Sequence, residues 1–208
     1  MEKQMNPSRK KILDKSFGLF LNENYDSVTM QQIQEASQVS RGAIYHHFKS
    51  KEDIFKEIVD IYLLPIFSSF SSITEEEKGT LLNTIYASIK CRQNHQLVLK
   101  EVVPFKMSDF YLYKFIFQAT EQYPEFSEQV NSLSEKEFNG WRNIIQAAMR
   151  TGEIRSDIEL DYVAQSLMTI PLGLGVFSAF SNYININTKD IRTSYLKFYN
   201  LLKKNSFL

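Results

Sequence analysis

The stretch that decides the fold is residues 29–48, which read TMQQIQEASQVSRGAIYHHF. Thr29 and Gln32 have the spacing of a capping box, in which the side chain of each residue bonds the backbone amide of the other. A helix is therefore expected to begin directly after Thr29. Ser40 is a second N-cap residue and predicts a helix over residues 41–47. The stretch predicts two short helices joined by a tight turn.

The apolar residues of this stretch define which faces are buried. Ile44 and Phe48 lie four residues apart on the second helix and can pack against Ile33 and Val39. The side chains that then face outward are Gly42, Ala43, Tyr45 and His46. Small residues let the helix backbone approach a surface closely, and an exposed tyrosine can both stack and donate a hydrogen bond. This layout is typical of a helix-turn-helix that places its second helix in the major groove of DNA.

A third helix is predicted immediately downstream. Ser50 is its N-cap residue, and Lys51 lies in its first turn. Backbone amide groups and an ammonium group together form an anion site at a helix N-terminus. The three helices therefore predict contact with a phosphate backbone.

Together with residues 9–25, this stretch resembles the TetR (tetracycline-repressor) family of bacterial transcriptional regulators. The resemblance covers roughly residues 8–60, and its spacing is more specific than that of a generic helix-turn-helix. The matching residues are Ile12, Leu13, Phe20, Tyr25, Thr29, Met30, Ile33, Val39, Ser40, Gly42, Ile44, Tyr45, His47, Phe48, Lys51 and Glu52. Two positions depart from the family pattern, because Gln38 and Asn24 stand where the family usually has glycine.

The resemblance implies a role for each matching position. The residues implied in contacts with phosphates or sugars are Thr29, Tyr45, His47 and Lys51, and those implied near base edges are Gln31, Arg41, Gly42, Ala43 and His46. Arginine suits guanine and glutamine suits adenine in the major groove. Which of Gln31, Arg41 and His46 reads a base stays open. The alternative is that Tyr45 and the two histidines form an ordinary solvated surface.

Composition limits the remaining classes. The chain has 208 residues with a formal net charge of +0, so it is not a polybasic protein that binds nucleic acid through charge alone. One cysteine, Cys91, excludes an intrachain disulfide framework and fits a reducing cytoplasm. The start of the chain is polar and predicts no signal peptide. The apolar run 167–180 is shorter than a bilayer span and predicts a buried helix.

The chain downstream of residue 50 has helical spacing and no strand alternation. We therefore predict an all-α fold, with a helix-turn-helix DNA-binding domain over residues 1–52 and a helical ligand-binding and dimerisation domain over 53–208. A capping box at Thr74 and Glu77 predicts a helix from there to about Arg92. Further helices are expected over residues 110–122, 125–150, 158–180 and 189–203.

In the resembling family the last two helices pair with their copies in a second subunit, which implies a homodimer. Two apolar stripes are compatible with such an interface: Val163, Leu167, Ile170, Leu174 and Phe177, and then Ile191, Tyr195, Phe198 and Leu202. Helices with apolar faces must bury them. Packing inside one subunit explains the stripes equally well. A dimer is favoured independently because two recognition helices read a pseudo-palindrome that one cannot.

The resemblance also implies a hydrophobic effector held by the central helices. Candidates for the lining are Phe105, Met107, Phe110, Tyr111, Phe115, Phe117, Trp141, Ile145 and Met168. Few charged residues interrupt these faces, so an apolar or amphipathic ligand is expected. Ordinary core packing is the alternative for most of these side chains.

Catalytic and metal sites are not expected. Cys91 and His95 lie four residues apart, but a metal site needs three or four ligands and a catalytic pair needs an orienting group. No phosphate-binding glycine loop is present. No enzyme activity and no cofactor are therefore predicted. The expected function is a cytoplasmic repressor that binds an operator as a dimer and is released by a ligand. The alternative is a helical relative that sequesters a ligand or docks a protein without binding DNA.

Overall fold

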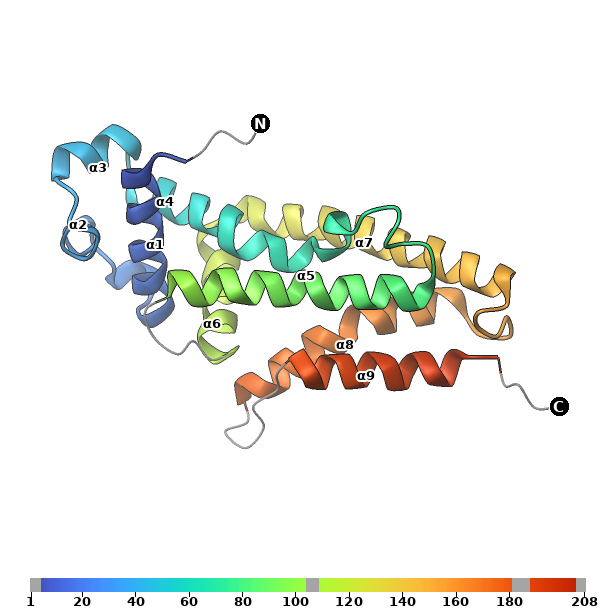
Figure 1. Cartoon of the computed structure of the whole chain (residues 1–208). Coiled ribbons are helices and arrows are strands. Elements are labelled where there is room, and N and C mark those ends of the chain that lie inside the picture. Colours follow the sequence, from blue (N-terminus) through green and yellow to red (C-terminus); the bar gives the residue numbers. More distant parts are fainter. Residues whose placement is uncertain (1–4, 104–108, 181–187, 205–208) are drawn as a thin grey trace. The chain divides into compact units, whose positions relative to one another are not determined.

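The computed structural model describes residues 5–103, 109–180 and 188–204, and most of these residues lie in helices joined by short turns and loops (Figure 1). Ile154 and Lys203 form an isolated β-bridge. The α-helices are α1 Pro7–Asn22, α2 Met30–Ser37, α3 Arg41–His47, α4 Lys51–Ile58, α5 Leu81–Val102, α6 Asp109–Gln122, α7 Pro124–Thr151, α8 Leu160–Phe180 and α9 Thr188–Leu202. The predicted all-α class is confirmed.

The helices form two compact units. The first unit comprises residues 1–65 and 96–128, and the second comprises 66–95 and 129–208. Helices α5 and α7 therefore contribute residues to both units. The predicted domain boundary after residue 52 stays a prediction, since the units follow spatial contacts and not chain order.

The first unit is built around α1. Its buried side chains include Phe17 and Phe20, both with no exposed surface. The ring of Phe17 meets that of Phe115 from α6 with centroids 5.3 Å apart, and Phe115 lies 5.3 Å from Phe55 of α4. Three helices distant in sequence thus share one aromatic core, which fixes the surface helices α2 and α3 beside α1 (Figure 1).

Helix α4 changes its winding at its end. After Ile58 the chain continues as a π-helical turn, Val59–Leu63, and then as a 3-10 turn, Leu64–Phe67. Proline cannot donate the amide hydrogen bond of a continuing α-helix, so α-helical winding does not resume at Pro65. Within this segment the Tyr62 hydroxyl donates a hydrogen bond to the Asp14 carboxylate on α1. Burial is the main cause that raises the pKa of Tyr62, with further contributions from Asp14.

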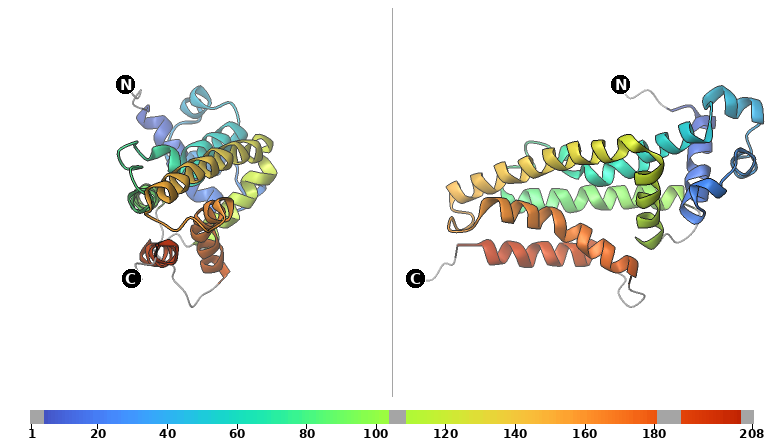
Figure 2. Two further views of the ribbon diagram at one scale, coloured as in Figure 1. Left: turned by 90° about the vertical axis from the view of Figure 1, so that its right-hand side faces the viewer. Right: turned by 180° about the vertical axis from the view of Figure 1, so that it is seen from behind.

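The second unit packs helices around Trp141, which has no exposed surface. Helices α8 and α9 lie side by side in all views (Figures 1 and 2). The Tyr195 hydroxyl of α9 donates to the Leu167 carbonyl of α8 over 2.9 Å, and both residues are buried. A buried tyrosine hydroxyl needs a hydrogen-bond partner. Because the Leu167 carbonyl is that partner, the bond fixes the register of the two helices.

The predicted start of α5 is wrong. Thr74 and Glu77 do form the reciprocal bonds of a capping box, but these bonds close a separate turn, and α5 begins at Leu81. The Glu153 carboxylate accepts hydrogen bonds from the backbone amides of Leu81 and Leu82, both over 3.0 Å. A group 72 residues away in sequence thus satisfies the free amides of this helix N-terminus.

The prediction that residues 167–180 form a buried helix is also wrong. They belong to α8, which has 21 residues and is long and apolar enough to cross a membrane by length and composition alone. Only 22% of its most apolar stretch is buried in the single chain. One face packs through Val163, Leu167 and Pro171. The opposite face stays exposed, which is also how a helix at a subunit interface looks in a single chain.

Candidate nucleic-acid interface

The helix-turn-helix predicted from residues 29–48 is present. Thr29 Oγ1 accepts from the Gln32 amide over 3.2 Å, and Gln32 Oε1 accepts from the Thr29 amide over 2.7 Å. Ser40 Oγ accepts from the Ala43 amide over 3.3 Å. Both helices therefore begin where their capping residues predict, and both N-terminal caps are formed by residues within three positions of each other.

The turn between α2 and α3 depends on Gln38. Its φ of 54° and ψ of 34° place it in the left-handed region, and no other non-glycine residue among those described has a positive φ. The family-typical glycine would adopt this conformation freely, whereas a side chain costs on the order of 1 kcal/mol there. Gln38 does form the turn, at an energetic cost.

Helix α3 buries one face and exposes the other. Ile44 and Phe48 are 1% and 3% exposed, and Ile33 of α2 is fully buried. Of the predicted contact residues, the exposed ones are Thr29, Gln31, Arg41, Gly42, Tyr45 and His46, and the half-buried ones are Ala43, His47 and Lys51. The structure thus brings the predicted base-reading and phosphate-binding positions of α2 and α3 to one surface.

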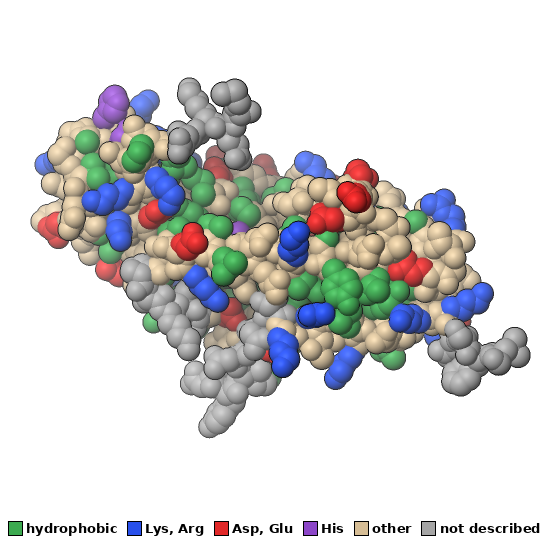
Figure 3. Space-filling model, viewed as in Figure 1, with side chains coloured by type: hydrophobic (Ala, Val, Ile, Leu, Met, Phe, Trp, Pro, Cys, Tyr) green, Lys and Arg blue, Asp and Glu red, His purple; other side chains and the backbone are tan. Residues whose placement is uncertain are grey.

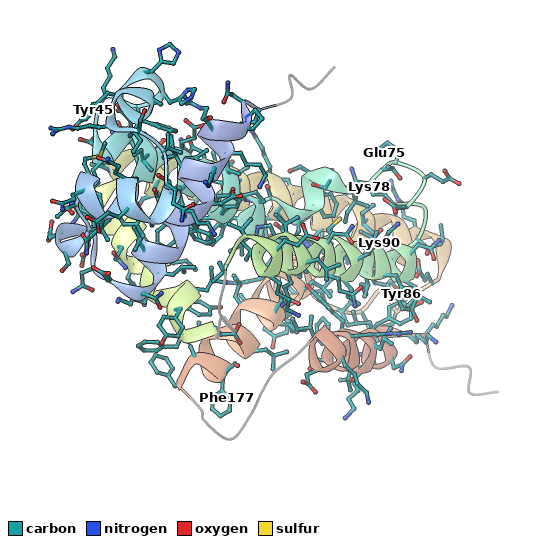
Figure 4. The ribbon with its side chains drawn as sticks, turned by 60° about the vertical axis from the view of Figure 1, so that its left-hand side comes forward. Tyr45, Glu75, Lys78, Tyr86, Lys90 and Phe177 are labelled. Carbon is teal, nitrogen blue, oxygen red and sulfur yellow. The ribbon has the colours of Figure 1, made fainter. Side chains whose placement is uncertain are left out.

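A hollow of about 400 Å³ lies between α2 and α3 on this surface. Arg41 and Gln31 line it, and so does Tyr45, which projects outward from α3 (Figure 4). The Arg41 guanidinium lies 5.7 Å from the centroid of the Tyr45 ring. Gln31 donates to the carboxylate of Glu35 over 2.9 Å, so an acidic group also lines the hollow. The polar groups of this hollow can meet base edges and phosphates.

Lys51 is held by the first unit itself. Its ammonium donates to the Tyr25 carbonyl over 2.7 Å and lies 4.1 Å from the centroid of the Tyr25 ring. Burial and the nearby carboxylates of Glu52 and Asp26 raise the pKa of the Tyr25 phenol, so the ring stays neutral. An ammonium has three protons, so Lys51 can still bind an anion while it holds Tyr25.

Sequence reasoning missed a contact at the end of the recognition helix. Arg9 of α1 donates to the His47 carbonyl over 2.9 Å and to Glu57 Oε1 of α4, also over 2.9 Å. Histidine side chains stand at the surface of this unit close to lysine and arginine side chains (Figure 3). The Arg9 contact had no sequence signal, because Arg9, His47 and Glu57 come together only in the folded unit.

The structure divides the two predicted dimerisation stripes. Val163, Leu167, Ile191, Tyr195 and Leu202 are at most 9% exposed and belong to the core of the second unit, which leaves them no surface for a partner. Ile170, Leu174 and Phe198 are partly buried against that core. Phe177 is 55% exposed and projects outward from α8 (Figure 4). The other exposed apolar residues of α8 and α9 are Tyr162, Val176, Phe180 and Leu201.

The predicted ligand-lining residues do not form one group. Phe115 belongs to the aromatic core of the first unit, and Trp141, Ile145 and Met168 belong to the core of the second. Phe110 and Phe117 of α6 are exposed, and Tyr111 is half-buried. Phe105 and Met107 lie outside the described residues. The alternative of core packing therefore holds for Phe115, Trp141 and Ile145.

The second unit holds a buried ion pair that sequence reasoning did not predict. Arg92 of α5 and Glu137 of α7 approach to 3.8 Å, and the Ser69 hydroxyl donates to Glu137 over 3.4 Å. Burial raises the pKa of the Glu137 carboxyl, while the charge of Arg92 opposes that shift. Charged groups at such a depth are costly unless paired.

From the sequence, no metal site is predicted at Cys91 and His95. Among the described residues, no group of three or more histidine, cysteine, aspartate or glutamate side chains could hold a metal ion. Cys91 is half-buried, and burial raises the pKa of its thiol. A raised pKa disfavours the reactive thiolate.

Comparisons with known proteins agree with this geometry. Residues 12–58 match the family described as bacterial regulatory proteins, tetR family. The chain is 24% identical over 159 residues to the HTH-type transcriptional repressor KstR2 of Rhodococcus jostii, an alignment that covers 74% of this chain and 71% of that protein. It is 26% identical over 160 residues to the HTH-type transcriptional regulator QacR of Staphylococcus aureus, with 69% and 71% covered.

A solved structure extends the likeness to the whole fold. The TetR-family transcriptional regulator of Cytophaga hutchinsonii superposes with a TM-score of 0.65 at 13% identity, covering 98% of this chain and 100% of that one. At that identity the likeness concerns the fold alone.

An all-helical chain with an exposed, capped recognition helix and these relatives is a DNA-binding transcriptional regulator. Its residues 12–58 match the DNA-binding domain of the tetR family of bacterial regulatory proteins, and the relatives it resembles are transcriptional regulators and not enzymes. Regulators of this family bind DNA and act as dimers, and they are generally cytoplasmic.

Proposed function

We propose that this regulator is a cytoplasmic repressor that binds a pseudo-palindromic operator as a homodimer and leaves it when a small ligand binds. The observation that carries the proposal is the surface of α2 and α3, where Arg41, Tyr45 and His46 are exposed together. Relatives named as repressors, such as KstR2, support repression over activation.

Each side chain of this surface has a role fitted to its chemistry. Thr29, Tyr45, His47 and Lys51 would contact phosphates or sugars, and so position the helix without reading sequence. Gln31, Arg41, Gly42, Ala43 and His46 would approach base edges, where arginine prefers guanine and glutamine prefers adenine. Small residues at 42 and 43 would let the α3 backbone enter the groove.

We propose that the dimer forms through the exposed faces of α8 and α9. Tyr162, Val176, Phe177 and Phe180 expose apolar surface on α8, and Leu201 does so on α9 at 74% exposure. Partly buried Ile170, Leu174 and Phe198 lie on the same two helices. A face this apolar marks a protein interface more often than open solvent. A two-fold dimer would present the same face twice.

The proposed effector is apolar or amphipathic and would bind among the helices downstream of residue 53. Abundant aromatic side chains and few charges support this ligand class. Ligand binding would move α4, which begins at Lys51, and with it the spacing of the two recognition helices. A ligand can shift such an equilibrium only through unequal affinity for the two states. Ligand and operator must then weaken each other by the same factor.

The first experiment is anisotropy binding to duplex DNA from the upstream region of the protein's own gene, with a scrambled duplex as control and salt varied. Selective, salt-dependent binding by a dimer is expected. Equal weak binding to both duplexes calls for a random-sequence selection. If that selection enriches no sequence, the protein does not read DNA selectively, and the repressor proposal is overturned in favour of a ligand-sequestering relative.

Arg41→Ala tests direct reading of bases. If Arg41 bonds a guanine, the substitution relaxes sequence preference at one position in each half-site, by about 1–3 kcal/mol of discrimination. An unchanged sequence profile removes Arg41 from the reading set.

A further inference from the structure

The recognition helix α3 ends close to a side chain from another helix. Its last residue, His47, has a carbonyl that no later residue of the seven-residue helix can satisfy. Arg9 of α1, 38 residues earlier, donates to that carbonyl from Nη1 over 2.9 Å. The Arg9 guanidinium also lies 4.3 Å from the centroid of the Phe48 ring, which follows the helix. One side chain therefore holds the end of α3 at two points.

The same guanidinium is held from its other side by α4. Arg9 Nε donates to Glu57 Oε1 over 2.9 Å, and Nη2 donates to the other carboxylate oxygen. The side chains of Arg9 and Glu57 are 32% and 24% exposed, so water competes only in part for this pair. A bidentate pair fixes the plane of a guanidinium, and a fixed plane directs the remaining N–H group to one place. Here that place is the His47 carbonyl.

We propose that Arg9 and Glu57 are positioning residues for operator recognition: Glu57 of α4 orients Arg9, and Arg9 sets the tilt of α3 relative to α1. The proposal rests on the proposed selective binding of an operator. The groups that would touch DNA, Arg41 and Tyr45, lie on the helix that Arg9 anchors. A change in the position of α4 relative to α1 would release the anchor and misalign those groups.

A competing role for Arg9 is direct binding to a phosphate. The two roles predict opposite results for Glu57→Gln. If Arg9 only contributes charge, removing a nearby carboxylate strengthens binding to every duplex. If Arg9 positions α3, the same substitution weakens operator binding although it removes a negative charge.

The test measures binding of the full chain to a duplex recovered by random-sequence selection and to a scrambled duplex, over a range of salt concentrations. If the wild-type protein prefers neither duplex, the proposed function is contradicted, and this outcome is distinct from a failure of the positioning role. Given wild-type preference, we expect Arg9→Lys and Glu57→Gln each to weaken operator binding about tenfold, with scrambled-duplex affinity and salt slope unchanged. Arg9→Lys keeps the charge but loses the fork geometry.

Glu52→Gln is the matched control, because Glu52 lies on the same helix and forms its ion pair with Lys56 and not with Arg9. It should leave operator preference intact. Amide hydrogen exchange distinguishes positioning from general destabilisation: amides of α3 should exchange faster in Glu57→Gln, while those of the α1 core keep their rates. Unchanged or stronger operator binding by Glu57→Gln overturns the proposal. Wild-type operator binding by Arg9→Lys also overturns it, because lysine keeps the charge that a phosphate contact needs and loses only the fork geometry.

Discussion

The surface of α2 and α3 and the outer face of α8 are both exposed in the single chain, but they differ in chemistry. The first exposes Arg41, Tyr45 and His46 on helices whose caps are local. The second exposes Val176, Phe177 and Phe180. A polar and aromatic surface is stable in water and can bind a charged partner reversibly. An apolar face is unfavourable in water and needs a permanent one, so the two surfaces have different partners.

The substitution with the largest expected effect breaks the apolar face. Phe177→Glu would place a charge in the proposed interface, and a two-fold dimer would carry it twice. We expect the dissociation constant of the dimer to rise about a hundredfold, as at other interface hot spots. Sedimentation equilibrium measures the change.

Phe117→Glu is the matched control, because Phe117 of α6 is 65% exposed and lies in the first unit, away from α8 and α9 in sequence. It should leave the dimer intact. Equal dimerisation by both variants would show that exposure of a phenylalanine on α8 has no role in assembly.

The difference between the two surfaces also explains what could be predicted from sequence. Caps and turns act within a few residues, so Thr29 and Ser40 located α2 and α3 correctly. Helical periodicity shows that a face is apolar but not what covers it. From the sequence, Tyr195 and Phe177 were equally compatible with a dimer interface and with packing inside one subunit. The structure separates them, because Tyr195 bonds Leu167 inside its own subunit.

Contacts between distant residues account for the remaining errors. Glu153 determines the start of α5, and Arg9 reaches the end of α3. Neither pairing has a local motif. Two of the aromatic residues predicted to line a ligand site, Phe115 and Trp141, lie in different cores for the same reason: an aromatic side chain at helical spacing can face any apolar surface.

The next effect concerns the polar surface. Lys51→Ala should weaken binding to operator and scrambled duplex alike, by about tenfold, and lower the salt slope by about one. Tyr45→Ala should weaken both as well, with less change in slope because tyrosine carries no charge. Anisotropy titrations over several salt concentrations measure both quantities.

Lys56→Ala controls for charge on the same helix, since Lys56 pairs with Glu52. Its slope should match that of the wild type. If Lys51→Ala also leaves the slope unchanged, the Lys51 ammonium serves only to hold Tyr25, and the phosphate role is excluded.

A smaller effect concerns the turn that joins α2 to α3. Gln38→Gly should raise the free energy of unfolding by about 1 kcal/mol, because glycine adopts the left-handed conformation without a side-chain clash. Chemical denaturation measures it. Gly152→Ala is the control in the opposite direction, because it adds a side chain at a φ of 76°. A Cβ there would meet nothing within 4 Å, so any decrease in the free energy of unfolding comes from the backbone conformation alone. A destabilised Gln38→Gly would mean that the glutamine side chain contributes more than its backbone costs.

The smallest effect concerns the one carboxylate that lines the α2–α3 hollow. Glu35 accepts a hydrogen bond from Gln31 and places a negative charge among groups proposed to meet DNA. Glu35→Gln should raise affinity for a scrambled duplex about threefold, since an exposed charge acts weakly across a screened distance. Glu121 is exposed on α6, so Glu121→Gln removes the same charge outside the hollow and should change the affinity less. If both variants bind scrambled DNA equally, Glu35 is not near the phosphates. If only Glu35→Gln binds scrambled DNA more tightly, the carboxylate of Glu35 lowers the affinity of the polar surface for DNA of the wrong sequence. The apolar face of α8 has no comparable group, because no charged residue lies between Tyr162 and Phe180.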